Sequence, residues 1–338
     1  MSSRLKTIAQ YLLILGVTLF LVFFSLRGIK VTEGENKWDF LLKTWNSADK
    51  MWLFIMAAIA LISHLLRAER WRMLMEPAGH HPKLSYSFIS LMVGYLVNIA
   101  IPRGGEVSRC YNLYKLDKTP VEISFGTVVV ERLVDVLCLL VLIGMAFLAE
   151  SSRLFEFIGT LPTAKGDNSL KYVILAAVFV IAVLAIIITR YIVRRNTRLK
   201  EFIHKKWQGF REGLMSIFKL QRKGLFFFYS IMIWFFYFLM SYATIQAFPE
   251  THHLGFAAVL SLFAIGSIAM AAPTPGGTGS YHVLVPQGLV FLYGIPQNDA
   301  VAFTFIFHGW QTAIMIVFGV ISIIATSLLV KRETASIS

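Results

Sequence analysis

Residues 98–109 read NIAIPRGGEVSR, and residues 273–281 read PTPGGTGSY. Each stretch interrupts a long apolar segment with proline and glycine, which end helices and leave backbone N–H and C=O groups without helical partners. Inside a membrane, such a break is tolerated where protein or a water-filled cavity surrounds it. The two breaks therefore predict a membrane protein with a polar interior.

The composition around these breaks is typical of a membrane protein. Of the 338 residues, 57% are hydrophobic and 15% are charged, whereas about 25% are charged in ordinary soluble domains. Apolar runs near the length needed to cross a bilayer, about 20 residues, recur along the chain. We expect full spans at 7–26, 50–67, 124–149, 171–190, 224–247 and 300–330.

The formal net charge of +13 is concentrated in residues 190–223. Aromatic and aliphatic residues alternate there with basic ones at helix-like spacing, which is typical of an amphipathic helix on an anionic membrane surface. Because Lys and Arg are enriched in cytoplasmic loops, this interpretation is favoured over a nucleic-acid site. With the basic loops 67–84 and 190–223 and the tail 331–338 in the cytoplasm, both termini are cytoplasmic, and 27–49 and 150–170 are external.

This orientation determines the paths of the two broken segments. Residues 85–123 must leave the cytoplasmic side and return to it, and residues 255–299 must start and finish outside. Both therefore form hairpins, broken near Pro102 and Pro275. Their arms, 85–101 and 109–121 in the first and about 255–272 and 281–295 in the second, are short for full crossings. This favours re-entrant hairpins whose tips approach each other near the bilayer midplane. The alternative is ten spans, in which the breaks are loops between short conventional helices.

Residues 1–149 and residues 171–330 then share one order of elements, which is span, span, broken hairpin, span. Their expected orientations are opposite, as in inverted-topology repeats that form a substrate site near the membrane centre. Residues 150–170 are the external loop between the repeats. The predicted fold is an all-α polytopic membrane protein with about six full spans and two re-entrant hairpins.

Charged residues after the first break are the best candidates for a site. Glu131, Arg132 and Asp135 lie on adjacent parts of one helical face. Charges in a membrane core face the protein interior, so we expect these three to pair with one another or with Arg103 or Glu106. Helix N-termini after Gly105 and Gly279 offer backbone N–H groups to an anionic head group. Such charges mark either a substrate pathway or a structural ion-pair network.

The candidate substrate-binding residues come from both halves of the chain. They are Arg103, Gly104, Gly105, Glu106, Arg109, Glu131, Arg132 and Asp135, followed by Pro275, Gly276, Gly277, Gly279, Tyr281, His308 and Gln311. Arginine suits phosphate because its guanidinium group donates two parallel hydrogen bonds. The second group is almost uncharged, so we expect an asymmetric site.

Motifs for catalysis or metal binding are weak. The glycine-rich run 275–280 lacks the Lys-Ser/Thr ending of a P-loop and follows no strand. The pairs His80-His81 and His252-His253 lie in loops at opposite expected faces, so they cannot form one metal site. We expect no catalytic residue, metal or cofactor.

Three motifs in combination carry a family resemblance. NIAIPRGGEVSR at 98–109, VERLVD at 130–135 and PTPGGTGSY at 273–281 resemble the lysylphosphatidylglycerol synthase transmembrane (flippase-like) family, over essentially the whole chain. In the best-known relatives, the module is fused to a soluble aminoacyl-transferase domain, and it moves the aminoacylated phosphatidylglycerol between leaflets. The resemblance implies a stand-alone membrane module without that transferase domain.

These features favour a lipid translocase over an enzyme. It would move a polar-headed phospho- or aminoacyl-phospholipid between the leaflets of the cell inner (cytoplasmic) membrane, through a central charged cavity. Its partners would be anionic or zwitterionic phospholipids and not nucleic acid. Assembly of the chain into an oligomer is compatible with these features. The alternative is a non-transporting, lipid-binding partner of a separately encoded glycosyl or aminoacyl transferase, docked through 190–223. A third hypothesis is an ion- or proton-coupled exporter that uses Glu131 and Asp135.

Overall fold

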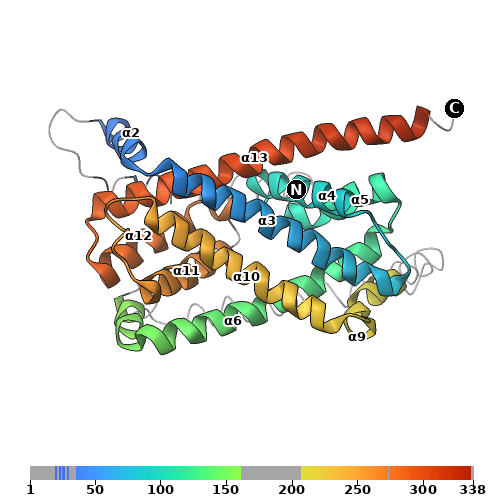
Figure 1. Ribbon diagram of the computed structural model, residues 1–338, viewed down its shortest axis with the longest axis horizontal. Coiled ribbons are helices and arrows are strands. Elements are labelled where there is room, and N and C mark those ends of the chain that lie inside the picture. Colours follow the sequence, from blue (N-terminus) through green and yellow to red (C-terminus); the bar gives the residue numbers. More distant parts are fainter. Residues whose placement is uncertain are drawn as a thin grey trace, which may run out of the picture.

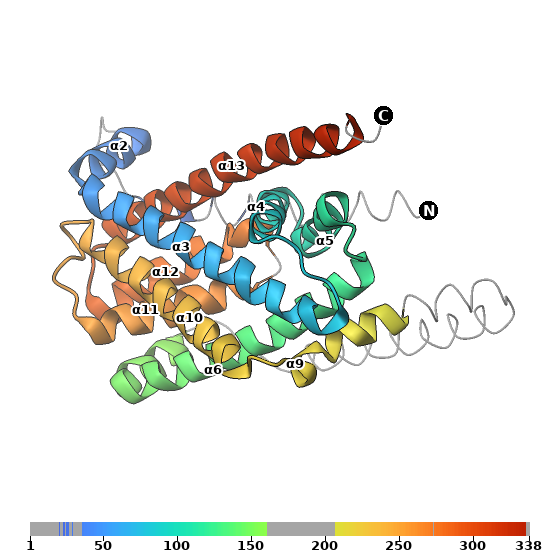
Figure 2. The ribbon, with the colours of Figure 1, turned by 45° about the vertical axis from the view of Figure 1, so that its right-hand side comes forward.

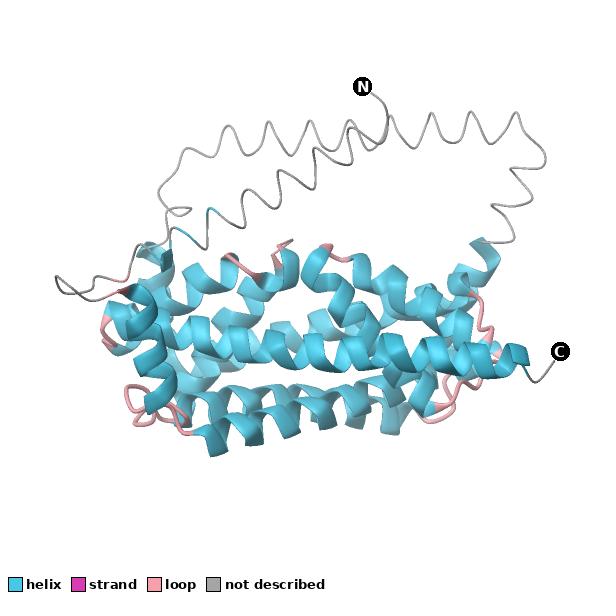
Figure 3. Ribbon diagram, turned by 90° about the horizontal axis from the view of Figure 1, so that it is seen from above, coloured by secondary structure: helices cyan, strands magenta, loops and turns pink. Residues whose placement is uncertain are grey.

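The computed structural model describes residues 36–160, 207–272 and 274–335, together with Phe20, Phe23, Ser25, Leu26 and Ile29. Within these residues the chain forms helices and loops and no strand, which confirms the all-helical class (Figure 3). The expected spans 7–26 and 171–190 lie outside or largely outside the described residues, as does most of the basic half of segment 190–223.

Four long helices form the frame of the molecule and run along its long axis (Figure 1). They are α3 (Lys50–Met75), α6 (Val121–Thr160), α10 (Lys223–Gln246) and α13 (Gln297–Ala335). All four contain a stretch that is long and apolar enough to cross a membrane. The helix α3 packs along α10 and also contacts α6 and α13.

The first broken segment is a hairpin of α4 (Leu84–Ala100) and α5 (Gly104–Asp117). Pro102 follows the end of α4, and Arg103 turns the chain with a left-handed φ of 59°. The N–H group of Gly105 donates to Oδ1 of Asn98 at 2.7 Å across the turn. A Cβ on Gly105 would collide with the carbonyl oxygen of Gly94, so glycine is what lets the arms approach this closely.

The second broken segment is a hairpin of α11 (Phe256–Ala271) and α12 (Ser280–Tyr293), joined through η3 (Pro275–Gly277). The turn needs left-handed backbone at Gly276, Gly277 and Gly279, with φ values of 57°, 77° and 96°. L-residues with a Cβ rarely adopt these angles, which explains the density of glycine in this stretch.

The two hairpins enter the frame from opposite ends and meet inside it (Figure 2). The guanidinium group of Arg103 donates to the carbonyl oxygen of Ala271 at 3.4 Å. A Cβ on Gly276 would lie 3.7 Å from the Cα of Ile99. These contacts confirm that the tips come together, while their depth in a bilayer stays a prediction.

Three regions expected as loops contain helix, which corrects the predicted boundaries. Residues 27–49 include α2 (Lys37–Ser47), which begins where Oδ1 of Asn36 accepts from the N–H of Trp38 at 3.3 Å. Residues 67–84 begin with the last turns of α3, followed by η1 (Glu76–Ala78).

The helix α6 likewise continues into the expected external loop 150–170, through residue 160. It is kinked at Glu150, whose φ and ψ are −143° and 45°. The Glu150 carboxylate accepts from the hydroxyl groups of Ser261 on α11 and Tyr293 on α12. These hydrogen bonds hold the end of α6 against the second hairpin. Residues 161–170 lie outside the described part of the chain.

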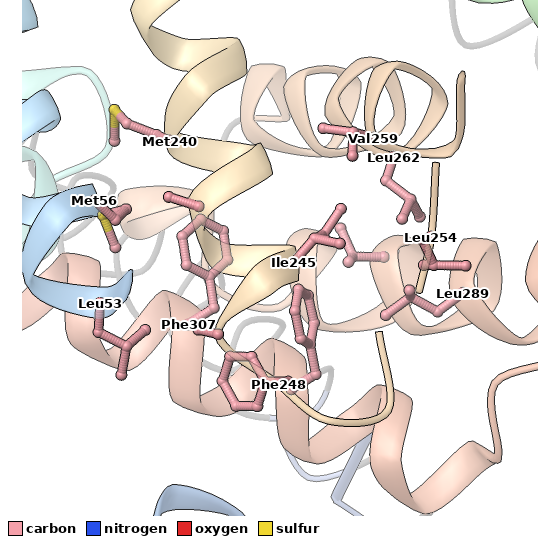
Figure 4. Close-up of a cluster of buried hydrophobic side chains, with 14 of the residues drawn as sticks. Leu53, Met56, Met240, Ile245, Phe248, Leu254, Val259, Leu262, Leu289 and Phe307 are labelled. Carbon is pink, nitrogen blue, oxygen red and sulfur yellow. The ribbon is translucent and has the colours of Figure 1, made fainter. Parts of the chain in front are cut away.

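The largest hydrophobic core lies between the second hairpin and α3, α10 and α13 (Figure 4). It includes Leu53, Met56, Met240, Ile245, Phe248, Leu254, Val259, Leu262, Leu289 and Phe307. By contrast, many large apolar side chains of α6 and α13 are exposed, for example Leu148 at 90% and Leu328 at 57%. A membrane protein presents such residues to lipid.

Candidate functional site

Glu131 on α6 joins α3 to α5. Its side chain is fully buried, and its carboxylate accepts from Nη2 of Arg109 on α5 at 2.6 Å. Its other oxygen lies 3.5 Å from Nη2 of Arg70 on α3. One carboxylate therefore holds guanidinium groups from two helices.

Asp135 lies one turn further along α6 and extends the same network. Its two carboxylate oxygens accept from Nη2 of Arg67 at 2.7 Å and from Nη2 of Arg70 at 2.8 Å. The two arginines also donate to α10, Arg67 to the hydroxyl group of Tyr237 at 2.9 Å and Arg70 to that of Ser230 at 3.2 Å. The network thus connects four helices, α3, α5, α6 and α10.

We call Arg67, Arg70, Arg109, Glu131 and Asp135 the buried charge cluster. With all groups ionised, its three guanidinium groups exceed its two carboxylates by one positive charge. Burying an unmatched charge is costly. A cluster of this composition is suited to receiving an anion.

Polar atoms beside the cluster lack protein partners among the described residues. They include the Nε atoms of all three arginines, both ring nitrogens of His64, the hydroxyl groups of Ser63, Ser87 and Tyr95, and Oε2 of Glu106. The rings of His64 and Tyr95 lie 4.7 Å apart, between α3 and α4. Because buried polar groups are nearly always hydrogen-bonded, these atoms indicate a region that accommodates water or a polar ligand.

Arg132 and Glu106 form a separate ion pair at 2.7 Å between α6 and α5. The Arg132 side chain is 46% exposed, whereas the arginine side chains of the buried charge cluster are buried. Arg103 is also exposed and lies at the meeting point of the hairpins. Gly104 and Gly105 form the first turn of α5.

The candidate residues of the second half gather around the second break. His308 Nε2 donates to the carbonyl oxygen of Gly276 at 3.0 Å. The Tyr281 ring stacks on the ring of His308 at 5.3 Å between centroids, and His282 lies edge-on to His308 at 4.8 Å. Pro275, Gly277 and Gly279 form the turn itself, and Gln311 is partly buried one turn after His308. No group of three or more metal-ligating side chains occurs in the described ranges.

Sequence reasoning missed the contribution of α3 and α10. The expected bounds put Arg67 at the end of the span 50–67 and Arg70 in the basic cytoplasmic loop 67–84. In the structure Arg67 binds Asp135, and Arg70 binds both Glu131 and Asp135. One signal was present, because His64, Arg67 and Trp71 are spaced as on one helical face, and Pro77 is the first proline after Lys50. Nothing in the sequence singles out Ser230 or Tyr237 as their partners.

Comparison with known proteins yields a family match and a relative. The family model described as lysylphosphatidylglycerol synthase TM region matches residues 8–319. A UPF0104 membrane protein of Methanocaldococcus jannaschii is 24% identical over 175 residues, which cover 49% of this chain and 48% of that protein. The match thus spans about half the length of the relative. No solved structure matches.

Proposed function

The chain belongs to the lysylphosphatidylglycerol synthase transmembrane family, and from that membership we propose that it moves a phospholipid between the leaflets of a membrane. The family is linked to the handling of membrane lipids, and this chain is a membrane protein with several apolar helices. The proposed substrate is a polar-headed phospholipid with a phosphate or aminoacyl-phosphate head group. No catalytic role is proposed for any residue.

The unmatched positive charge of the buried charge cluster is the observation that carries this proposal. A phospholipid phosphate is an anion, and guanidinium groups bind phosphate through paired N–H donors. The Nε atoms of Arg67, Arg70 and Arg109, which have no partner among the described residues, supply further donors. A bound phosphate balances the cluster, while the acyl chains stay in lipid.

The arrangement of helices supports an alternating-access mechanism. In each half, a long helix is followed by a broken hairpin and a second long helix: α3, α4–α5 and α6, then α10, α11–α12 and α13. The hairpins enter from opposite ends (Figure 1), as expected for inverted repeats that rock against each other around one site. We propose six full spans and two re-entrant hairpins, of which four spans fall in the described residues.

The distribution of charge supports an orientation in the inner membrane. Lys118, Arg222 and Lys331 lie at the end of the frame where α5 and α13 finish and α10 starts. Lys and Arg accumulate on the cytoplasmic side. This end, with both termini, is therefore proposed to be cytoplasmic.

Leaflet-to-leaflet movement of fluorescent phosphatidylglycerol in proteoliposomes tests the function. We expect movement faster than in protein-free vesicles, and a loss of about tenfold or more in Arg109→Gln, because one charged hydrogen bond is worth about 1.5–3 kcal/mol. This variant removes the unmatched charge but leaves Glu131 beside Arg70. The control is Arg222→Gln, since Arg222 is 55% exposed and pairs with Glu76 at the surface. Lipid movement no faster than in protein-free vesicles would contradict the proposal.

A second candidate is a lipid-binding partner of a separately encoded transferase. It is favoured by a surface of exposed aromatic and basic residues in 207–219, where Trp207 is 57% and Phe218 is 70% exposed. Arg211 and Lys219 lie on the same segment. Co-purification of a glycosyl or aminoacyl transferase would favour this candidate if lipid transport is absent. The double variant Trp207→Ala with Phe218→Ala should then abolish the co-purification.

A further inference from the structure

Hydrogen-bond donors without protein partners lie along one side of the buried charge cluster. Ser63, Arg67 and Arg70 recur at helical spacing on α3, so they share one face of that helix. The hydroxyl group of Ser63 and the Nε atoms of both arginines are buried and have no partner among the described residues. Adjacent donors on α3 are therefore left unpaired at the edge of the cluster.

The first hairpin brings further donors to the same place. The Tyr95 ring on α4 lies 4.7 Å from the His64 ring on α3, and its buried hydroxyl group has no partner in the described part of the chain. This hydroxyl group interacts electrostatically with Arg67 and Arg109. On α5, the Nε atom of Arg109 likewise lacks a partner in the described ranges. Donors from three helices thus surround one part of the cluster.

The charges of this region favour a monovalent anion over a cation or water. All carboxylate oxygens of Glu131 and Asp135 already accept from guanidinium groups, so the cluster has no free carboxylate for a cation. The neighbouring pair of Arg132 and Glu106 is neutral and leaves the excess of one positive charge unchanged. Water satisfies the donors but not the charge, and burying an unmatched charge is costly.

Chloride meets both requirements, because it carries one negative charge and accepts hydrogen bonds from O–H and N–H groups. Hydrogen bonds to an ion are stronger than those between neutral groups, so a buried set of such donors suits it. We propose that the buried charge cluster binds chloride beside Ser63 and Tyr95, and that the lipid phosphate displaces this ion. The second part rests on the proposed transport of a phospholipid.

Displacement of chloride gives the proposed transport a counter-ion. A phosphodiester and chloride carry the same charge, so either one balances the cluster. The unloaded cluster would instead carry its excess charge through the protein interior on its return, which is costly. With chloride bound on the return, one lipid moves in one direction for each chloride that moves in the other, and no net charge crosses the membrane.

Binding of radioactive chloride to the purified protein in detergent tests the site without lipid transport. We expect saturable binding whose affinity falls about tenfold in Tyr95→Phe, because this variant loses one hydrogen bond to an ion. The phenylalanine ring keeps the contact with His64, so the fold is retained. The matched control is Tyr242→Phe on α10, whose ring packs edge-on against Trp52 and which should bind chloride as the unmodified chain does.

Charge and lipid separate the outcomes of this assay. Arg109→Gln should abolish chloride binding, because it removes the excess positive charge. Phosphatidylglycerol added to the micelles should displace chloride, whereas diacylglycerol, which lacks the phosphate, should not. Absent chloride binding, or equal affinities in Tyr95→Phe and Tyr242→Phe, would overturn the site. Chloride that phosphatidylglycerol does not displace would overturn the sharing of the site.

Proteoliposomes test the exchange. Chloride inside the vesicles should speed inward movement of fluorescent phosphatidylglycerol severalfold relative to gluconate, and a chloride-sensitive dye should report that chloride leaves. Lipid movement that is equal in chloride and gluconate would overturn the exchange and leave the transport proposal intact. Chloride binding without any lipid movement would contradict the transport proposal, and the exchange with it, but not the chloride site.

Discussion

Glu131 is the residue on which the charge cluster depends most. Within the described part of the chain, removing its charge leaves Arg109 without an ionic partner and Arg70 with Asp135 alone. Breaking a buried ion pair by removing one partner costs about 3–5 kcal/mol. We expect Glu131→Gln to lower the free energy of unfolding by about that amount, as measured by detergent-induced unfolding in micelles.

The control for this change is Glu76→Gln, which breaks the pair with the half-exposed Arg222. Exposed pairs contribute about 1 kcal/mol or less. Equal losses in the two variants would contradict the assignment of Glu131 as the centre of the network.

Gly105 sets the distance between the arms of the first hairpin. A Cβ there would meet the Gly94 carbonyl oxygen and the Asn98 side chain, so Gly105→Ala should destabilise the protein by about 1–3 kcal/mol, as overpacking does. Gly144→Ala is the matched control, because its Cβ would meet nothing within 4 Å. It should be neutral or stabilising by up to about 1 kcal/mol. The same unfolding assay compares the two, and equal effects would contradict the close approach.

At the scale of elements, the contact between the hairpin tips can be trapped covalently. A Cβ at position 276 would lie 3.7 Å from the Cα of Ile99. This brings the two residues within reach of a disulfide, whose Cα atoms lie about 4.4–6.8 Å apart. We expect Ile99→Cys with Gly276→Cys, in a chain whose Cys110 and Cys138 are replaced by Ala, to crosslink on oxidation. If the tips must separate during transport, oxidation stops lipid movement and a reductant restores it.

A non-contacting pair provides the comparison for the crosslink. Ile99→Cys with Leu148→Cys joins the tip to an exposed position on α6, and it should not crosslink within the monomer. Failure of the tip pair to crosslink, with both thiols accessible, would contradict the meeting of the hairpins.

The elements were predictable from sequence where apolar runs and breakers define them. The arms of both hairpins and the starts of α10 and α13 lie within a few residues of the predicted bounds, because Pro102, Pro275 and the glycines beside them interrupt the helical pattern at the two breaks. The end of α3 was not predictable in this way. Arg67 and Arg70 are equally compatible with a solvated loop and with a buried cluster, until their partners on α6 and α10 are known.

Part of the site could also be predicted from the sequence. Charges in an apolar span must face the protein interior, which identified Glu131 and Asp135. Helical spacing also groups Arg132 with them, and its ion pair with Glu106 on α5 is one of the expected pairings. The spacing does not show that the Arg132 side chain is 46% exposed, because the neighbouring helix determines its exposure.

At the scale of the whole molecule, the proposed orientation predicts which face is reached from outside the cell. A membrane-impermeant maleimide should label Lys43→Cys on α2 in intact cells, because this end is expected to be external. Lys331→Cys on α13 should be labelled after permeabilisation only. Both side chains are exposed, so accessibility of the thiol does not confound the comparison. The reverse labelling pattern would contradict the orientation.

The hydrogen bonds of Glu150 have a mechanical consequence for the molecule. Near its start, α6 is tied to α5 of the first hairpin through Glu131 and Arg109, and at its kink Glu150 ties it to both arms of the second hairpin through Ser261 and Tyr293. The helix is continuous between these two points. If the hairpins rock in the proposed transport, this part of α6 transmits the movement of one hairpin to the other.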